Sequence, residues 1–189
     1  MGSAGPRVFK IASEPWEHEA MSRLNYQTFS EEIPQHAPNP ERRLNDRMLD
    51  RSTCFICLEG ERLVGMVGVN GDRPFSLDAK IPDLDRYLPP GLRPCEIRRL
   101  AVEPGRRGGP VFAGLLACVL SHAHRRGYDL GLISAIDRQW DLYRHLGFVP
   151  FGPPLGTPEA RYQGMSVTWD QLAVSARLLA TERGRGVTA

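Results

Sequence analysis

The fold is decided by residues 95–127, which read CEIRRLAVEPGRRGGPVFAGLLACVLSHAHRRG. The segment Glu96–Val102 is short and rich in apolar residues, and Pro104 then removes a hydrogen-bond donor, so we expect a strand that ends there. Pro110 suits the first position of a helix, and apolar residues then recur at spacings of three and four, namely Val111, Phe112, Leu115, Leu116, Val119, Leu120 and Ala123. The stretch therefore predicts a strand, a loop and a helix that closes at Gly127.

The loop of this unit, Arg106-Arg107-Gly108-Gly109, is cationic and rich in glycine. Unpaired backbone N–H groups at the helix start, the positive end of the helix dipole and two guanidinium groups together suit a phosphate or a pyrophosphate. The alternative is that the two glycines make only a tight turn and that the arginines are solvated. This stretch alone leaves both interpretations open.

The same loop resembles the acetyl-coenzyme A loop of the GNAT acyltransferase superfamily, whose pattern is Arg or Gln, two residues, Gly, one residue, then Gly or Ala. Arg106 and Gly109 match that pattern. Val111 stands where the second small residue belongs, and Pro110 has no N–H, so one usual phosphate donor is missing. The loop is thus a partial match.

A second motif lies downstream in DLYRHLGF, Asp141–Phe148. It resembles the helix of the same superfamily that ends in Leu-Tyr, a short gap and Gly-Phe, although Ile136 occupies a position where an Asn often precedes that helix. The two motifs stand in the expected order and are together more specific than either alone. With the strands expected around them, the resemblance covers most of the chain.

The resemblance implies an α/β fold with α+β layering, the GNAT fold. This fold is a mixed, mostly antiparallel sheet of about seven strands with helices on both faces. Its central parallel strand pair is splayed at the cofactor site. The order of elements agrees, because residues 129–136 form a near-continuous apolar run that predicts a buried strand parallel to Glu96–Val102.

Hydrophobic patterns predict the remaining elements. We expect strands at 7–12, 53–58, 63–69, 148–151 and 165–169, and helices at 17–29, 41–50, 138–146 and 170–183. The turn at 59–62 joins two of these strands into a hairpin, and Gly152-Pro153-Pro154 is expected to end another.

Residues 72–94 contain many prolines and charged side chains and no long apolar pattern. Loops longer than about 15 residues in a compact domain are usually functional or mobile. One interpretation is that the loop lines an acceptor or acyl pocket with Arg73, Phe75, Ser76, Asp78 and Lys80. The other is a surface excursion with one short helical turn near 83–87.

The resemblance also implies catalytic residues for acyl transfer to an amine. Glu96 matches the strand carboxylate that serves many superfamily members as the base, directly or through water; the alternative is a salt bridge with a neighbouring arginine. Tyr143 matches the tyrosine that protonates the departing thiolate, and its alternative is a half-buried packing role. Strand alternation places Glu96 and Arg98 on one face and Arg99 on the other.

Two sets of binding residues follow from the same resemblance. The donor would contact Leu100, Ala101, Val102, Arg106, Arg107, Gly108, Gly109, Val111 and Phe112. The region after the first strand often borders the acceptor pocket, and its candidates are Tyr26, Phe29, Glu31, Glu32 and His36, beside Arg73, Phe75 and Ser76 of the long loop. Ordinary packing or surface roles are the alternative for each residue singly.

The expected activity is N-acyl transfer from acetyl-coenzyme A or another acyl-coenzyme A to the amine of a small molecule or an amino acid. The run EIRRLAVEP, with FGPP and Tyr162-x-Gly164, also resembles the N-acyl amino acid synthases and acyl-homoserine lactone synthases, which take acyl chains from acyl carrier protein. A third hypothesis is a non-catalytic module that binds acyl-coenzyme A, because Pro110, Val111 and Ile136 depart from the enzyme pattern.

Length and charge narrow the remaining classes. The chain has 189 residues, which suits one domain at 7–183 with a flexible leader at 1–6 and a disordered tail at 184–189. A net charge of +2 gives no reason to expect a nucleic-acid partner, and no apolar run reaches the roughly 20 residues that span a bilayer. We expect a cytoplasmic monomer or homodimer. Cys54 and Cys57 have a C-x-x-C spacing without a second pair nearby, so no metal is expected.

Overall fold

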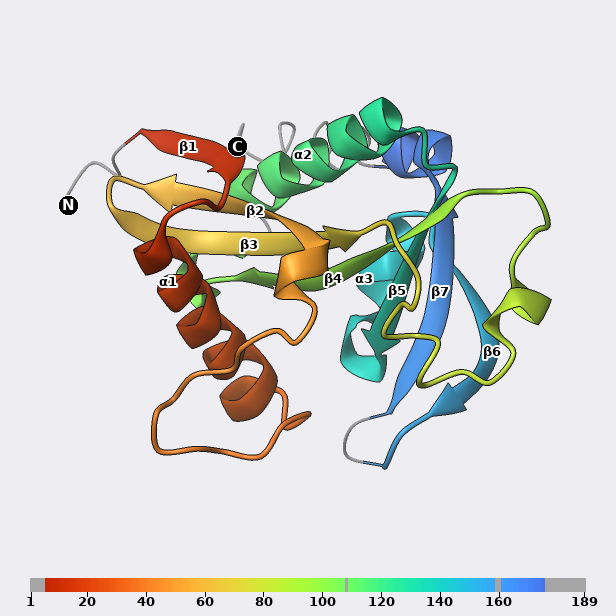
Figure 1. Cartoon of the computed structure of the whole chain (residues 1–189), viewed down its shortest axis with the longest axis horizontal. Coiled ribbons are helices and arrows are strands. Elements are labelled where there is room, and N and C mark those ends of the chain that lie inside the picture. The colour runs from red at the N-terminus through yellow and green to blue at the C-terminus, as the bar shows by residue number, and fades with distance from the viewer. Residues whose placement is uncertain (1–5, 108, 159–160, 176–189) are drawn as a thin grey trace, which may run out of the picture. The chain divides into compact units, whose positions relative to one another are not determined.

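The structure, a computed structural model, describes residues 6–107, 109–158 and 161–175. Its strands form a seven-stranded sheet in the order β1-β2-β3-β4-β5-β7-β6 (Figure 1). The strands are β1 (Arg7–Ile11), β2 (Ser52–Glu59), β3 (Arg62–Asn70), β4 (Pro94–Val102), β5 (Leu130–Ile136), β6 (Val149–Leu155) and β7 (Tyr162–Thr168). The main helices are α1 (Pro15–Tyr26), α2 (Pro110–Arg126) and α3 (Trp140–His145), with a π-helix η1 (Gln27–Glu32) directly after α1.

The pairing confirms the predicted fold class. β1 with β2, β2 with β3, β5 with β7 and β6 with β7 are antiparallel, whereas β4 and β5 are parallel. The parallel pairing covers Pro94–Glu96 and Leu130–Leu132, and β4 then continues to Val102. Contacts group the chain into two compact units: unit 1 runs to Asn70 and includes Ile97–Val119, and unit 2 comprises Gly71–Glu96 and the chain from Leu120 onward.

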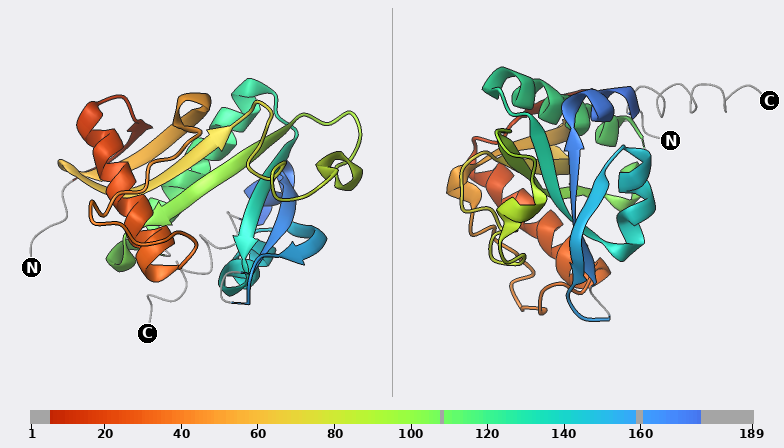
Figure 2. Two further views of the ribbon diagram at one scale, coloured as in Figure 1. Left: turned by 60° about the horizontal axis from the view of Figure 1, so that its bottom comes forward. Right: turned by 90° about the vertical axis from the view of Figure 1, so that its right-hand side faces the viewer.

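In unit 1, helices cover both faces of the sheet. Met21 and Leu24 of α1 pack with alternate residues of β2 and with Met66 of β3, so α1 lies on one face (Figure 2). The neighbouring Gly65 points to the other face, where a Cβ atom would stand only 2.7 Å from a methyl group of Val111 on α2. Glycine at this position thus allows α2 to approach the sheet closely.

The backbone of β4 departs from regular strand geometry at Arg99, which has a φ angle of 49°. A non-glycine residue rarely adopts this left-handed conformation, and it turns the side chain away from the alternation of a strand. As a result Arg98 and Arg99 both contact the carboxylate of Asp46. The prediction that these two arginines occupy opposite faces was wrong for this reason.

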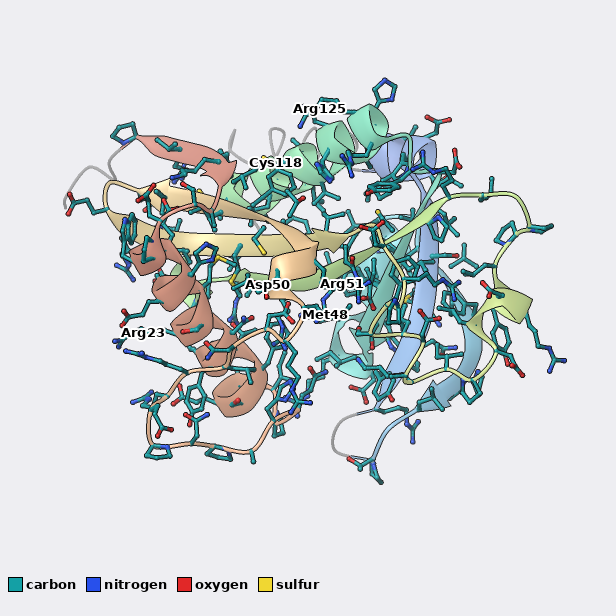
Figure 3. All side chains as sticks on the ribbon, in the orientation of Figure 1. Arg23, Met48, Asp50, Arg51, Cys118 and Arg125 are labelled. Atoms are coloured by element: carbon teal, nitrogen blue, oxygen red, sulfur yellow. The ribbon has the colours of Figure 1, made fainter. Side chains whose placement is uncertain are left out.

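The predicted helix at 41–50 is absent, and only Leu49–Arg51 forms a 3-10 turn, η2. Side chains compete with the helix for backbone groups: the Asn39 amide bonds both the N–H and the carbonyl of Arg43, and Asp46 accepts the N–H of Met48. The N–H of Leu44 donates to Ser22 of α1. Figure 3 shows Met48, Asp50 and Arg51 close together where the chain enters β2.

In unit 2, the segment between β3 and β4 supplies part of the core. Phe75, Leu77, Ile81 and Leu84 are buried against Leu130 and Leu132 of β5. Lys80 reaches the Ser134 hydroxyl at 3.3 Å and lies over the Tyr162 ring. The surface-excursion interpretation holds only in part: most of the segment is exposed and the short helical turn is present as η3 (Leu84–Tyr87), but four apolar side chains enter the core.

β6 does not end at Gly152-Pro153-Pro154 as predicted. Its pairing with β7 breaks after Phe151 and resumes at Leu155. The Gln163 side chain donates to the carbonyls of Phe151 and Gly152, at 3.1 and 2.7 Å, and so satisfies two acceptors of β6 where its ladder with β7 is interrupted.

Residues 169–175 are helical, and the rest of the helix predicted at 170–183 lies outside the described residues, as do the predicted tail at 184–189 and residues 1–5 of the predicted leader. Among the described residues, no helix has both the length and the apolar character needed to cross a bilayer.

Candidate active site

Glu96 is the last residue of β4 that pairs with β5, and only 1% of its surface is exposed. Its carboxylate accepts hydrogen bonds from the Ser76 N–H at 2.8 Å, the Ser76 hydroxyl at 2.6 Å and the Leu77 N–H at 3.1 Å. These donors fix both oxygens in place. The structure thus joins two residues that the sequence had proposed for different roles, Glu96 as base and Ser76 as substrate contact.

The turn that presents Ser76 is held by charges on either side of it. Arg73 forms ion pairs with Asp78 and Asp85 and lies 5.3 Å from the centre of the Phe75 ring. Asp78 also accepts the N–H of Phe75 at 2.6 Å. Phe75 itself is buried in the core, so both predicted substrate residues, Arg73 and Phe75, organise the turn. Ser76 is half-buried, so it is the more exposed residue of its pair with Glu96.

Tyr143 lies on α3, which follows β5 through a 3-10 turn, η5 (Asp137–Gln139). Trp140 anchors this corner by donating its indole N–H to the Ala135 carbonyl at 3.1 Å. The Tyr143 ring meets Phe148 edge-on with centroids 5.4 Å apart. Burial raises the pKa of Tyr143 to about 12, so the hydroxyl keeps its proton at neutral pH and is available as a donor.

In unit 1, Arg106 is tied to the sheet. Its guanidinium donates to Glu59 at 2.9 and 2.7 Å, and Arg7 donates to the other oxygen of Glu59 at 2.8 Å. The hydrogen bond from Arg106 is the largest cause of a lowered pKa at Glu59. Only 6% of the Glu59 side chain is exposed, so Arg106 anchors the loop to the end of β2.

Arg107 has different partners. Its Nε donates to the carbonyl of Val102 at 2.8 Å, and its Nη2 pairs with Glu32 at the end of η1. Both side chains of that pair are partly open, with 45% of Arg107 and 29% of Glu32 exposed. The structure therefore brings one predicted acceptor residue, Glu32, to the predicted donor loop.

The other predicted donor contacts divide into backbone and core. Ala101 and Val102 are buried and Leu100 is half-buried on β4. Val111 packs on Gly65, which explains why a larger residue stands where the GNAT pattern has a small one. Phe112 is half-buried, Gly109 lies open beside the Arg106 carbonyl, and Gly108 is outside the described residues.

A cluster of half-buried charged residues near the predicted acceptor residues was missed at the sequence level. Asp46 pairs with Arg98 at 2.8 Å and with Arg99 at 3.4 Å, and Arg99 lies over the Phe29 ring. The cluster borders a cavity of about 30 Å³, enough for one or two water molecules. The adjacent arginines were visible in the sequence, but nothing in it linked them to Asp46, 52 residues away from Arg98.

Tyr26 is buried, and its hydroxyl accepts the N–H of Asn39 at 3.3 Å, so it fastens the following segment to α1. Cys54 packs with the α1 side of the sheet, and the odd spacing within β2 directs Cys57 to the opposite face. The two thiols therefore cannot bind one metal ion together.

Sequence comparison adds to this geometry. The family model described as N-acyl amino acid synthase FeeM matches residues 20–168. The chain belongs to the FeeM family of N-acyl amino acid synthases. The match includes β4, the basic loop, α2 and the second motif. No curated protein matches the chain.

Solved structures share the fold at low identity. FeeM, an N-acyl amino acid synthase from uncultured soil microbes, has a TM-score of 0.74 and 20% identity over 93% of this chain and 98% of its own. The coenzyme A-dependent acyl-homoserine lactone synthase BjaI, solved with SAM and isopentyl-CoA, has a TM-score of 0.69 and 22% identity over 86% and 81%. An aminoglycoside 6'-N-acetyltransferase complexed with coenzyme A has a TM-score of 0.61 and 15% identity over 86% and 97%.

These findings confirm the GNAT fold, and the family match confirms the resemblance to the N-acyl amino acid synthases. The chain is an N-acyltransferase of this type, and the hypothesis of a purely non-catalytic module is set aside. The solved relatives bind coenzyme A or an acyl-coenzyme A in the two complexes named above.

Proposed function

We propose that the protein transfers an acyl group from a phosphopantetheine thioester to the amino group of an amino acid. The observation that carries this proposal is the buried Glu96 carboxylate bonded to the half-buried Ser76 hydroxyl, in a chain of the FeeM family. A buried carboxylate behind an accessible hydroxyl can accept a proton through that hydroxyl. Transfer to an amine requires such a proton acceptor.

In the proposed reaction the neutral amine attacks the thioester carbonyl, so that a C–N bond forms and the C–S bond breaks. The amine proton passes to Ser76 Oγ while the Ser76 proton passes to Glu96 Oε1, along the 2.6 Å hydrogen bond. The two backbone N–H donors of Ser76 and Leu77 hold the carboxylate in position throughout. Glu96 later returns its proton to water.

Tyr143 supplies the second proton in this proposal. The departing thiolate takes the phenolic proton, and the phenolate is then reprotonated from water. A pKa of about 12 keeps the phenol protonated in the resting enzyme and makes it a weaker acid than an exposed tyrosine, so its proton moves only as negative charge builds up on the sulfur. Acid–base catalysis of this kind contributes about 10²- to 10⁴-fold in rate.

The donor phosphate is assigned to the loop at Arg107 and to the first turn of α2, and the pantetheine arm to the backbone of Leu100–Val102. Pantetheine carries amide groups that can extend a strand edge through backbone hydrogen bonds. Val111 and Phe112 would offer N–H groups at the helix start. These assignments rest on the loop motif.

Two donors share this chemistry: an acyl-coenzyme A, acetyl or longer, and an acyl chain on acyl carrier protein. The loop motif favours coenzyme A. The carrier protein is favoured by the loop's missing N–H at Pro110 and by the engagement of Arg106 with Glu59, because both features reduce the donors left for a pyrophosphate.

The test is calorimetry with coenzyme A, acetyl- and longer acyl-coenzyme A, and acylated carrier protein, followed by an assay of thiol release with single amino acids. We expect binding of one donor class and thiol release that requires an added amino acid. Thiol release at the same rate without any amine, or no binding of either donor at millimolar concentration, would contradict the proposal.

A further inference from the structure

The two loop arginines differ in how firmly they are held. Arg106 donates twice to Glu59, whose other oxygen is filled by Arg7, and the carboxylate is almost completely buried. Arg107 gives its Nη2 to Glu32 at a partly open position. Removing Arg106 from its partner would leave a buried charge, which is costly, whereas an exposed ion pair contributes only about 0–1 kcal/mol. Arg107 is the loop cation that can change partners.

Glu32 is suited to leave this contact. Its Oε2 pairs with Arg107, while its Oε1 is buried and has no hydrogen-bond partner among the residues that the structure describes, so this oxygen gains hydrogen bonds when the side chain moves into water. A carboxylate that uses one oxygen loses little when that bond is replaced by water. Glu32 is also the last residue of the π-helix η1, directly before the extended Ile33, so its release does not break a regular α-helix.

The position of the pair relates it to the donor strand. Arg107 Nε holds the carbonyl of Val102 at 2.8 Å, so the guanidinium stays at the end of β4 even without Glu32. Phe29 of the same π-helix lies under Arg99, which keeps η1 beside β4. An anion that binds at the loop therefore finds the Arg107 guanidinium held in place and already paired with the Glu32 carboxylate.

We propose that Glu32 is a specificity residue that occupies the place of the donor phosphate on Arg107 in the free enzyme. The proposal rests on the proposed function, which assigns the donor phosphate to this loop. A donor with a phosphate displaces Glu32 because a phosphate provides more charge and more acceptor oxygens than one carboxylate oxygen. A thiol without phosphate cannot displace it, so the pair selects phosphorylated donors over small free thioesters.

The experiment measures donor affinity by calorimetry for the wild type, Glu32→Gln, Arg107→Ala and the double variant. The probes are coenzyme A, 4'-phosphopantetheine and pantetheine, which has no phosphate. Glu103→Gln is the matched control. It removes the same charge at the start of the loop, but Glu103 pairs with Arg62 and not with Arg107. Should Glu32→Gln fail to fold, Glu32→Asp takes its place in the experiment, because it shortens the side chain that reaches Arg107 by one methylene.

We expect Glu32→Gln to bind coenzyme A or phosphopantetheine up to about fivefold more tightly, the factor that corresponds to an exposed ion pair. Pantetheine affinity stays unchanged, and so does coenzyme A affinity in Glu103→Gln. In the Arg107→Ala background, Glu32→Gln has no effect. The inference would be overturned if Glu32→Gln raised coenzyme A affinity no more than Glu103→Gln does, or if it still raised that affinity in the Arg107→Ala background.

These outcomes are distinct from a failure of the proposed function. If the wild type releases no thiol in response to an amino acid, the proposed function is contradicted. The displacement of Glu32 by the donor phosphate is judged separately, by the difference in coenzyme A affinity between the Glu32 and Glu103 variants. Equal affinity of 4'-phosphopantetheine and coenzyme A would assign the exchange to the phosphate that coenzyme A and carrier proteins have in common.

Discussion

Glu32 in unit 1 and Glu96 in unit 2 are both carboxylates at predicted site positions, yet they are held in opposite ways. Glu96 is buried and is fixed by two backbone N–H groups and a hydroxyl. Glu32 is partly open and is held by one arginine. Buried hydrogen bonds to backbone fix a group in one geometry, while exposed ion pairs are weak enough to exchange. The first arrangement suits proton transfer, and the second suits binding and release of an anion.

The largest effect is expected at the fixed carboxylate. Glu96→Gln should lower turnover about 10³-fold, because it removes the final proton acceptor. Ser76→Ala should lower it similarly while keeping both backbone hydrogen bonds to Glu96. Rate measurements from pH 6 to 10 should show partial recovery of Glu96→Gln as more amine is deprotonated. Full turnover in Ser76→Ala would exclude the relay and leave Glu96 to act directly.

Tyr143→Phe should reduce turnover about 10²-fold with nearly unchanged donor affinity, since only the transition state uses the phenolic proton. The comparison of kcat with the calorimetric Kd separates these effects. Phe keeps the edge-on contact with Phe148, so a large loss of thermal stability is not expected. A variant that binds donor poorly but turns over normally at saturation would contradict the acid role.

Substitution of the loop arginine that pairs with Glu32 should change donor affinity. Arg107→Ala is expected to weaken donor binding about tenfold, because one charge-assisted hydrogen bond to phosphate is lost. Arg106→Ala should instead lower the melting temperature, since Glu59 then loses one of two cations in a nearly buried site. Calorimetry and thermal melts of both variants check this contrast. Equal loss of affinity in the two variants would mean that both arginines bind the donor.

Glu17 of unit 1 provides a third carboxylate, which is held by as many hydrogen bonds as Glu96. Burial opposes its ionisation, but hydrogen bonds from Lys10 and from the N–H groups of Ser13 and Glu14 outweigh burial and lower its pKa to about 2. Because the folded pKa lies below the ordinary value of 4.5, its stabilisation is complete above pH 4.5 and is lost as the pH falls toward 2.

Glu17→Gln should therefore cost about 1–3 kcal/mol of unfolding free energy at pH 7, with unchanged kcat. Urea unfolding at pH 7 and pH 3 measures the effect, and the difference between the variant and the wild type should shrink at the lower pH. An equal difference at both values would contradict the assigned charge.

The regular parts of the fold followed from the sequence because their periodicity is local. The apolar runs of β2 and β3, which are buried on both faces, and the three-and-four spacing of α2, which buries one face, are local patterns, so the bounds of these elements were predicted within one residue. The failures were contacts between distant residues. Asn39 and Asp46 diverted backbone groups at 41–50, and the left-handed φ of Arg99 turned one side chain of β4.

The sequence predicted which residues belong to the candidate site but not which of them contact one another. Glu96, Ser76, Glu32 and Arg107 were all named from motifs or loop position, yet the sequence did not show that Ser76 bonds Glu96 or that Glu32 pairs with Arg107. The Ser76–Glu96 contact spans 20 residues and the Glu32–Arg107 contact spans 75, so no local pattern encodes them. A carboxylate near a basic loop is a common feature of sequences and does not identify its partner.

The most direct test of the account is the product of a single reaction. Purified protein is incubated with an acyl thioester, on coenzyme A or on carrier protein, and an equimolar mixture of ¹⁵N-labelled amino acids, and the products are analysed by mass spectrometry. The account predicts an N-acyl amino acid that retains the label, formed by the wild type and not by the Glu96→Gln and Tyr143→Phe variants at the same time point. Consumption of thioester without any labelled amide would contradict it.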